Sequence, residues 1–356
     1  MMPGLIAAVL AGGMGERLGP LTRTVPKPLV PYAGRCRMID FSLENCATSG
    51  VRETVLMSKH LAVPLIRYMH GEWGQRLALN FGRYQPVADL AEGAPLPEIA
   101  PPPEQGTADA LITNRPFIDQ PWAEHVLVLH CDHIYNFDYR PLYQHHLAEG
   151  AALTIGFQRI ERRYVSLFGM VAFDAHGRLT EFVEKPADPR SDCVFTAVGI
   201  FAKDVMYRYL DRLSAGTWRH DISFDLIPAM LAGGEKIIGF AFDDYWEDIG
   251  TVERYWRAHL RLAADEAHLR APHTLPGAET LIRPAEPRFE QALLPAALAD
   301  GALSAREAVI FPGATIGAGA VIERSVVLPG TIIAAGERLS DSVAAPAGRV
   351  SMVAHG

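Results

Sequence analysis

The sequence predicts an α/β protein in which helices cover a mixed, mostly parallel sheet, followed by a short C-terminal left-handed parallel β-helix. Three observations support this fold class. Short apolar runs end at glycines, strand-like segments alternate with helix-like ones, and apolar residues recur every sixth position near the C-terminus. The length of 356 residues suggests about two domains.

The expected elements follow one another along the first 262 residues. We expect helices over 39–49 and 142–149, each followed by a glycine that can cap it. We expect strands over 5–11, 54–57, 125–130, 152–158, 168–174 and 180–184. Residues 93–104 hold five prolines and predict a loop, either a surface connector or a wall of an active site.

The pattern changes after residue 262. Residues 263–300 have weak periodicity and are expected to form a linker. Residues 301–346 carry the six-residue period, with apolar residues at Ile310, Ile316, Ile322 and Leu328, typical of a left-handed β-helix. Residues 347–356 form a tail, and residues 1–262 form the expected catalytic domain.

Composition excludes several classes of partner. The net charge is −8 and the isoelectric point about 5.9, so we expect binding neither to nucleic acid nor to an acidic membrane surface.

The expected location follows from the cysteines and the N-terminal segment. The four cysteines form no CxxC pair, and the N-terminal apolar run lacks a basic leader. No apolar run is long enough to span a bilayer. We expect a cytoplasmic protein.

A glycine-rich loop follows the first strand. Its residues are Leu10, Ala11, Gly12, Gly13 and Gly15. Such a loop lets backbone N–H groups approach phosphate oxygens, and Arg17 and Lys27 would add positive charge. The spacing fits neither GxGxxG nor a P-loop, because Leu18 replaces the last glycine of the former and no Gly-Lys-Ser/Thr follows.

The chain resembles the sugar nucleotidylyltransferases, or NDP-sugar pyrophosphorylases. The resemblance rests on LAGGMGERLGPLT, PKPLVP, RMIDFSLENC, GTADA, CDHIY, FGM, FVEKP and YWEDIGT, which occur in family order over residues 5–260 and are most similar to bacterial ADP-glucose pyrophosphorylase. The resemblance implies a Rossmann-like catalytic domain. It also implies transfer of a nucleoside monophosphate from an NTP to a sugar 1-phosphate, with release of pyrophosphate.

The resemblance also implies roles for individual residues. Arg17, Lys27 and Lys185 would be catalytic, and Asp132 and Asp248 would hold Mg²⁺. Asp132 follows a predicted strand, where α/β sheets place ligands, and carboxylates suit Mg²⁺. The nucleotide would contact Leu10, Ala11, Gly12, Gly13, Gly15, Gly106 and Thr107, and the acceptor would contact Gly169, Glu184, Lys185 and Thr196.

Several positions depart from the adenylyltransferase pattern. Residues 102–105 replace an aromatic pair, Gly19 replaces an activator-binding lysine, Cys131 replaces a glycine, and Thr196-Ala-Val-Gly199 replaces Ser-Met-Gly. Two interpretations remain open. The protein is a compact ADP-glucose pyrophosphorylase using ATP and glucose 1-phosphate, or a specialised relative using GTP or ATP and a cyclitol 1-phosphate such as valienol 1-phosphate.

Two other classes of protein fit the sequence less well. A non-catalytic regulatory subunit would often lose its charged site residues, whereas Arg17, Lys27, Asp132, Lys185 and Asp248 are all retained. The histidines near the CDHIY segment are spaced too closely for a zinc site. The family resemblance and the predicted β-helix favour a homodimer or tetramer.

Overall fold

The computed structural model describes residues 2–34, 36–90, 94–100, 103–266, 269 and 281–352. Parts of the predicted proline-rich loop, linker and tail lie outside these residues. The chain divides into two compact units. Unit 1 consists of Met1–Gly12, Asn45–Cys131 and Phe137–Asp244, and unit 2 of Gly13–Glu44, Asp132–Asn136 and Tyr245–Gly356. Each unit is described separately.

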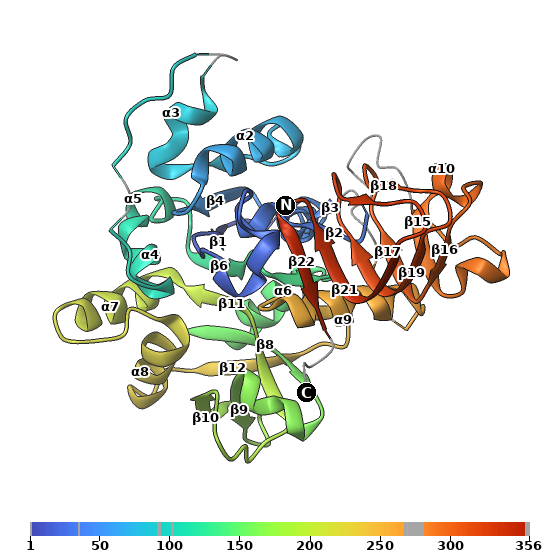
Figure 1. Ribbon diagram of the computed structural model, residues 1–356. Helices are drawn as coiled ribbons and strands as arrows, with labels where there is room; N and C mark the ends of the chain where they lie inside the picture. Colours follow the sequence, from blue (N-terminus) through green and yellow to red (C-terminus); the bar gives the residue numbers. More distant parts are fainter. Residues whose placement is uncertain are drawn as a thin grey trace. The chain divides into compact units, whose positions relative to one another are not determined.

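Unit 1 is built on a nine-stranded sheet with the main order β10-β9-β11-β6-β1-β4-β5 (Figure 1). The strand β8 pairs with β11 and β12. The bounds are β1 Leu5–Leu10, β4 Glu53–Met57, β5 Leu79–Asn80, β6 His125–His130, β8 Leu153–Arg159, β9 Gly169–Phe173, β10 Leu179–Glu184, β11 Cys193–Ala202 and β12 Ile237–Ala241.

The sheet is mixed rather than mostly parallel. β1 runs parallel to β4 and β6, but β11 runs antiparallel to β6, β8 and β9. The reason is the connection from β9 through β10, which turns back as an antiparallel pair instead of crossing over through a helix. Parallel pairing is thus limited to the part around β1 and to the pair of β8 and β12, and the expectation of a mostly parallel sheet is wrong for the rest.

Helices pack against this sheet. They are α2 Ala62–Trp73, α3 Gln85–Ala88, α4 Thr107–Thr113, α5 Arg115–Ile118, α6 Tyr139–Glu149, α7 Lys203–Ser214 and α8 Ile227–Ala232, with a π-helix over Ile222–Leu226 and 3-10 turns over Gly82–Tyr84 and Arg162–Leu167. Side chains alternate along β1, so Ile6 and Ala8 share one face. Both belong to one buried cluster with Leu111 of α4, Leu210 of α7 and Met230 of α8.

Unit 2 contains short ribbons and one long helix. Two 3-10 turns, Glu16–Leu21 and Lys27–Leu29, precede the ribbon of β2 Pro31–Tyr32 and β3 Cys36–Arg37. A second ribbon pairs β7 His133–Tyr135 with β13 Trp246–Asp248. Helix α9 spans Val252–Ala263, while α1, Met38–Ser49, crosses the division between the units.

The C-terminal strands of unit 2 repeat every 17 residues. Ser304 pairs with Val321 and Val321 with Arg338, both in parallel, and Thr315 pairs with Ile332 at the same offset. The elements are β14 Leu281–Ile282, a 3-10 turn Pro287–Phe289, β15 Ala292–Pro295, α10 Ala296–Ala299, β16 Ser304–Arg306, β17 Ala308–Ile310, β18 Thr315–Ile316, β19 Val321–Val327, β20 Ile332–Ile333, β21 Arg338–Ala345 and β22 Gly348–Ser351.

Residues with positive φ mark the bends of this repeat. They occur at Glu307, Gly313, Gly319, Arg324, Gly330, Gly336 and Asp341. The spacings are six, six and five residues, which accounts for a repeat of 17 rather than the 18 that a strict six-residue period requires. The shorter side ends at a bend occupied by Arg324 or Asp341 instead of glycine. The bend is stabilised by an ion pair, because the Arg324 guanidinium donates to both carboxylate oxygens of Asp341 at 2.6 Å.

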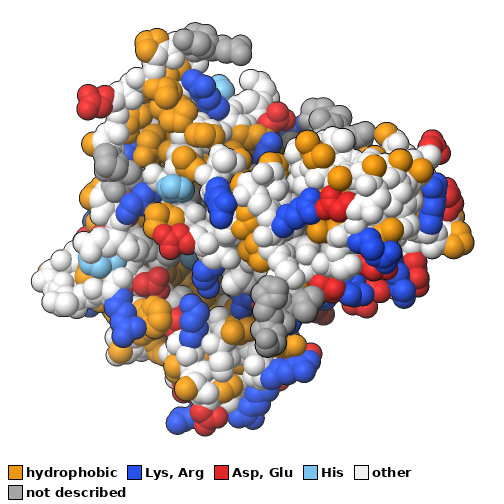
Figure 2. Space-filling view, viewed as in Figure 1, with side chains coloured by type: hydrophobic (Ala, Val, Ile, Leu, Met, Phe, Trp, Pro, Cys, Tyr) orange, Lys and Arg blue, Asp and Glu red, His pale blue; other side chains and the backbone are white. Residues whose placement is uncertain are grey.

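The surface carries both signs of charge. Figure 2 shows Lys and Arg side chains interspersed with Asp and Glu on the face drawn. Among the described helices, none is both long enough and apolar enough to cross a membrane.

Candidate active site

In unit 2, the glycine-rich loop is held by its own backbone. Gly15 has φ 69° and precedes the 3-10 turn, and its carbonyl accepts hydrogen bonds from Leu18 N at 2.8 Å and Thr22 Oγ1 at 2.9 Å. Because L-residues are strained at this φ, glycine is favoured here. Gly13 differs, because a Cβ built on it would meet no atom within 4 Å. The structure of the free protein therefore explains Gly15 but gives no packing reason for Gly13.

Lys27 is buried and paired with a predicted metal ligand. It is 7% exposed, and its Nζ donates to Oδ2 of Asp132 at 2.6 Å. A buried ammonium group requires such a partner, since desolvation without one is costly. Lys27 and Asp132 are 105 residues apart in the sequence, so the fold of unit 2 brings two predicted site residues into contact.

Asp248 lies at the end of β13, opposite His133 of β7. Its Oδ2 accepts a hydrogen bond from Arg254 Nη1, in the first turn of α9, and Ile249 N donates to the carbonyl of Asp132 at 2.9 Å. Potential ligand atoms of Asp132, His133 and Asp248 all lie within 4.8 Å of one another. The two predicted metal carboxylates are thus neighbours in unit 2.

Arg17 lies beside Asp248. A Cβ built on Gly250 would lie 3.6 Å from Nη2 of Arg17 and 3.5 Å from Oδ1 of Asp248, so both charged groups flank this glycine. Unit 2 therefore gathers Arg17, Lys27, Asp132 and Asp248, four of the charged residues expected from the sequence.

In unit 1, the carboxyl end of β1 is fixed by hydrogen bonds to neighbouring segments. Ala11 N donates to Met57 O at 2.9 Å, and Cys131 N donates to Leu10 O at 3.1 Å. A Cβ on Gly12 would lie 3.2 Å from Cβ of Lys59. The Lys59 ammonium in turn donates to the carbonyl of Glu104, so this strand end faces a lysine.

Gly106 and Thr107 form the start of α4. A Cβ on Gly106 would lie only 2.2 Å from the carbonyl oxygen of His220, so no other residue fits without a backbone shift. Thr107 Oγ1 donates to Asp221 Oδ2 at 3.0 Å and accepts from Ile222 N at 2.9 Å. The predicted nucleotide loop is thereby tied to residues 220–222.

Glu184 and Lys185 lie where β10 ends. Lys185 is a non-glycine residue with φ 50°, and its Nζ lies 3.3 Å from Oε1 of Glu184. The Lys185 side chain is 56% exposed, whereas the Glu184 side chain is 12% exposed. A Cβ on Gly169 would lie 2.8 Å from Glu184 Oε2, so a larger residue here would displace the Glu184 carboxylate. Gly169, Glu184 and Lys185 thus form one group, with an ammonium accessible to an anion.

Thr196 is placed differently from these acceptor residues. It is fully buried, and its Oγ1 donates to the carbonyl of Gly156 at 2.9 Å. The pairing of β11 with β8 shifts register between Phe195 and Gly199, and Ala197 has φ 60°. The run that departs from the adenylyltransferase pattern is therefore a bulge. Its threonine hydroxyl already has a partner within unit 1.

Three residues near Asp132 and Asp248 were not predicted from the sequence as part of the site. His133 lies between the two carboxylates, Trp246 contacts His133, and Arg254 pairs with Asp248. His133 and Trp246 belong to the quoted motifs, but the close spacing of the histidines argued against metal binding by them. Arg254 lies outside every motif, and only the helix that starts at Val252 brings it near Asp248.

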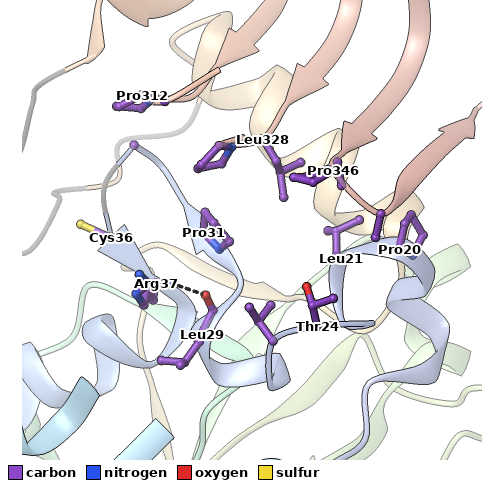
Figure 3. A pocket seen from close by; sticks show the side chains of 16 residues that line it. Pro20, Leu21, Thr24, Leu29, Pro31, Cys36, Arg37, Pro312, Leu328 and Pro346 are labelled. Carbon is purple, nitrogen blue, oxygen red and sulfur yellow. Dashed lines mark hydrogen bonds between the residues drawn. The ribbon is translucent and has the colours of Figure 1, made fainter. Parts of the chain in front are cut away.

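Unit 2 also contains a pocket of about 540 Å³ (Figure 3). Its walls are mostly apolar, with Pro20, Leu21, Pro31, Leu328 and Pro346 among them. Of the described residues that line it, Arg37 alone is charged, and its Nη1 donates to the carbonyl of Leu29 at 3.0 Å. The pocket therefore offers little charge to an anionic ligand.

Comparisons with known proteins agree with the motifs. The sequence model of the family described as Nucleotidyl transferase matches residues 6–265. The chain is 45% identical over 338 residues to valienol-1-phosphate guanylyltransferase from Streptomyces hygroscopicus subsp. limoneus, covering 90% of this chain and 89% of that protein.

Two glucose-1-phosphate adenylyltransferases are more distant. The protein from Paraburkholderia phytofirmans is 35% identical over 280 residues, covering 73% of this chain and 65% of its own length. The protein from Thermotoga neapolitana is 34% identical over 271 residues, covering 73% and 61%. The chain thus spans just under two thirds of these adenylyltransferases.

These matches confirm the resemblance to nucleotidylyltransferases and the expectation of a nucleotidyltransferase enzyme. The match over residues 6–265 includes every residue assigned to the site from the sequence. This chain belongs to the nucleotidyl transferase family.

Proposed function

We propose that this protein transfers a guanylyl group from GTP to a cyclitol 1-phosphate of the valienol 1-phosphate type. The observation that carries this proposal is the 45% identity to valienol-1-phosphate guanylyltransferase, which extends over 90% of this chain and 89% of that protein. A second candidate is adenylyl transfer from ATP to glucose 1-phosphate. The 33–35% identity to adenylyltransferases over 72–73% of the chain favours it.

The reaction is an in-line displacement at phosphorus. A phosphate oxygen of the acceptor attacks the α-phosphorus of the NTP and forms a new P–O–P bond. The bond between the α-phosphorus and the bridging oxygen to the β-phosphate breaks, and pyrophosphate leaves with that oxygen. Two anions must meet, so the protein has to neutralise charge and align the reactants rather than supply a covalent nucleophile.

Unit 2 would hold the leaving group. The backbone N–H groups of Gly13 and Gly15 would approach the triphosphate, and the cations of Arg17 and Lys27 would balance its charge. Lys27 is already ordered by Asp132, so little side-chain entropy would be lost on binding. Arg17 and Lys27 are therefore proposed as the catalytic cations of this unit.

Asp132 and Asp248 fit a divalent cation, and we infer that it is Mg²⁺. Nucleotidyltransferases of this family use a divalent metal, and the paired carboxylate oxygens are the hard ligands that Mg²⁺ prefers. When bound, Mg²⁺ would neutralise phosphate charge and polarise the P–O bonds. Asp132 and Asp248 would hold the ion, while Lys27 and Arg254 orient the carboxylates through their Oδ2 atoms.

Unit 1 would bind the nucleotide and the acceptor. The carboxyl end of β1, at Leu10, Ala11 and Gly12, and the start of α4, at Gly106 and Thr107, would contact the nucleotide. The exposed Lys185 ammonium would bind the acceptor phosphate and Glu184 an acceptor hydroxyl, with Gly169 leaving room for Glu184. Thr196 would act on the acceptor through the shape of the β11 bulge, because its hydroxyl donates to Gly156.

The C-terminal repeat supports a further structural proposal. Parallel strands at a 17-residue offset, with three bends per repeat, are consistent with a short left-handed β-helix over residues 301–346. We propose that it serves as an oligomerisation module, giving a homodimer or tetramer. Sedimentation equilibrium would test this, and a monomer at micromolar concentration would refute it.

The function is tested by pyrophosphate release with Mg²⁺. GTP, ATP, UTP, CTP and dTTP are each offered valienol 1-phosphate and then glucose 1-phosphate. Turnover with GTP and the cyclitol phosphate alone supports the proposal, and turnover with ATP and glucose 1-phosphate supports the second candidate. Silence in every combination would refute both and favour a non-catalytic regulatory subunit.

A variant pair tests the proposed metal ligand. Asp132→Ala should lower turnover at least about a hundredfold, because a missing charge-stabilising group costs about 3 kcal/mol or more. The change also removes the partner of the buried Lys27 ammonium, so Asp132→Asn, which keeps an oxygen acceptor for Lys27, is measured beside it and should show the same loss. Asp341→Asn in the C-terminal repeat is the control, since Asp341 pairs with Arg324 away from the carboxylate pair. Unchanged turnover of Asp132→Ala would exclude Asp132 as a metal ligand.

A further inference from the structure

The ribbon of β7 and β13 places four side chains on one face. Asp248 pairs with His133 and Trp246 pairs with Tyr135 across the antiparallel ladder. Because side chains alternate along a strand, these four residues share a face, and Ile134 and Glu247 share the other. The His133 ring is stacked near those of Tyr135 and Trp246, with interplanar angles of 17° and 19°.

Trp246 determines which nitrogen of His133 carries hydrogen. The indole Nε1 donates to Nδ1 of His133 at 3.0 Å. An indole nitrogen is a donor only, so Nδ1 must accept and cannot itself carry hydrogen. In a neutral imidazole the hydrogen then sits on Nε2. The contact with Trp246 therefore fixes the Nε2–H tautomer.

The Nε2–H group faces the carboxylate pair. Nε2 lies 3.9 Å from Oδ1 of Asp132 and 3.9 Å from Oδ1 of Asp248. The Oδ2 atoms of the same carboxylates are bound by Lys27 and Arg254. The histidine thus directs an N–H bond, not a lone pair, toward the two Oδ1 atoms.

We propose that Trp246 is a positioning residue that sets metal selectivity through His133. This inference rests on the proposed function, in which Asp132 and Asp248 hold a divalent cation. A nitrogen that carries hydrogen cannot ligate a metal, so the cluster offers carboxylate oxygens only and favours Mg²⁺. With the other tautomer, the same cluster would be two carboxylates and an imidazole nitrogen, a donor set that suits Zn²⁺.

The first test needs no metal. Long-range ¹H–¹⁵N correlation NMR on ¹⁵N-histidine-labelled protein reports the tautomer of each ring, and His133→Gln assigns the signals of His133. We expect the Nε2–H tautomer in the wild type and a detectable Nδ1–H population in Trp246→Phe. A wild-type ring with hydrogen on Nδ1 would overturn the inference.

The second test measures selectivity directly by calorimetric titration of Mg²⁺ and Zn²⁺ into the full chain. Trp246→Phe keeps an aromatic ring but removes the N–H group. We expect it to bind Zn²⁺ about tenfold more tightly, in line with the size of other outer-shell effects, while Mg²⁺ affinity changes less than about threefold. The double variant Trp246→Phe/His133→Gln is the control for zinc bound elsewhere, and it should lose the gain.

The outcomes separate this inference from the proposed function. Unchanged Zn²⁺ affinity in Trp246→Phe, or a gain that persists in the double variant, would overturn the inference and leave the carboxylate pair as the Mg²⁺ site. Failure of the wild type to bind Mg²⁺, even with GTP present, would refute the proposed metal site and the selectivity role together. Visible absorption of bound Co²⁺ gives an independent signature, which should change in Trp246→Phe when the imidazole becomes a ligand.

Discussion

Gly13 and Gly15 lie in one loop, yet the structure gives them different reasons to be glycine. An alanine at position 15 would have to adopt φ 69°, which costs about 1–2 kcal/mol. Its Cβ would lie 3.0 Å from Thr22 Cγ2 and 3.1 Å from Lys27 Cβ, so both neighbours must move by a few tenths of an ångström. The reduced entropy of the unfolded chain returns about 0.4–1 kcal/mol. We therefore expect Gly15→Ala to lower the free energy of unfolding by about 1–2 kcal/mol.

Gly13→Ala should behave in the opposite way. Nothing lies within 4 Å of the added Cβ, and φ at this position is not in the left-handed region, so stability should change by less than about 0.5 kcal/mol. If the loop cradles the triphosphate, the methyl group would instead obstruct the close approach of phosphate to the backbone. We expect the KM for the nucleotide to rise about tenfold or more.

The two variants are compared by urea denaturation and by nucleotide-dependent pyrophosphate release. Loss of stability in Gly15→Ala and loss of nucleotide affinity in Gly13→Ala would support both assignments. An unchanged KM in Gly13→Ala would refute the close approach of phosphate at that residue. A Gly15→Ala protein as stable as the wild type would refute the conformational reasoning.

Three further substitutions test other parts of the structure. Gly106→Ala should lower the free energy of unfolding by about 2–4 kcal/mol, because its Cβ would lie 2.2 Å from a backbone carbonyl oxygen. Gly71→Ala in α2 is the control: its Cβ would meet no atom within 4 Å, so stability should be unchanged or higher. Urea denaturation compares the two variants. Burial lowers the pKa of His259 to about 4, so its contribution to stability is present above pH 6.5 and is lost as the pH falls toward 4. The stability lost between pH 6.5 and pH 4 through His259 should amount to about 3 kcal/mol. A His259→Gln variant whose free energy of unfolding falls with pH as steeply as that of the wild type would contradict this. Arg254→Gln should raise the Mg²⁺ concentration needed for half-maximal turnover about tenfold, whereas Arg257→Gln, which breaks only an exposed pair with Glu253, should not change it.

The sequence predicted best where one segment determines its own structure. The apolar run at 5–10, the helix that ends at Ser49 and the strand at 125–130 each carry a local periodic signal and a glycine or polar boundary. The extent of antiparallel pairing in the sheet could not be predicted in this way. Strand direction depends on whether a connection crosses over or turns back, and the predicted strands at 168–174 and 180–184 read alike in either case. The strand β11, which pairs antiparallel with three neighbours, was not predicted from the sequence.

The repeat shows a similar limit. A six-residue period predicts bends every six residues, and glycines mark two of the three, for example at Gly313 and Gly319. The third bend is occupied by Arg324 and comes after five residues. A charged residue at a bend resembles any surface position in the sequence. Its φ of 40° is held by pairing with Asp341, a contact between residues 17 positions apart.

The motifs pointed to both members of the carboxylate pair but not to the side chains around it. Two carboxylates that lie close together repel, and neighbouring cations can offset this repulsion. Lys27 and Arg254 supply that compensation through the Oδ2 atoms, and the indole of Trp246 orients His133 toward the Oδ1 atoms. Lys27 could be found from its own motif, but the role of Trp246 depends on the register between β7 and β13, which brings Trp246 to His133 from 113 positions away. Residue type thus identifies which groups can bind a cation, whereas the contacts that orient these groups emerge only from the folded chain.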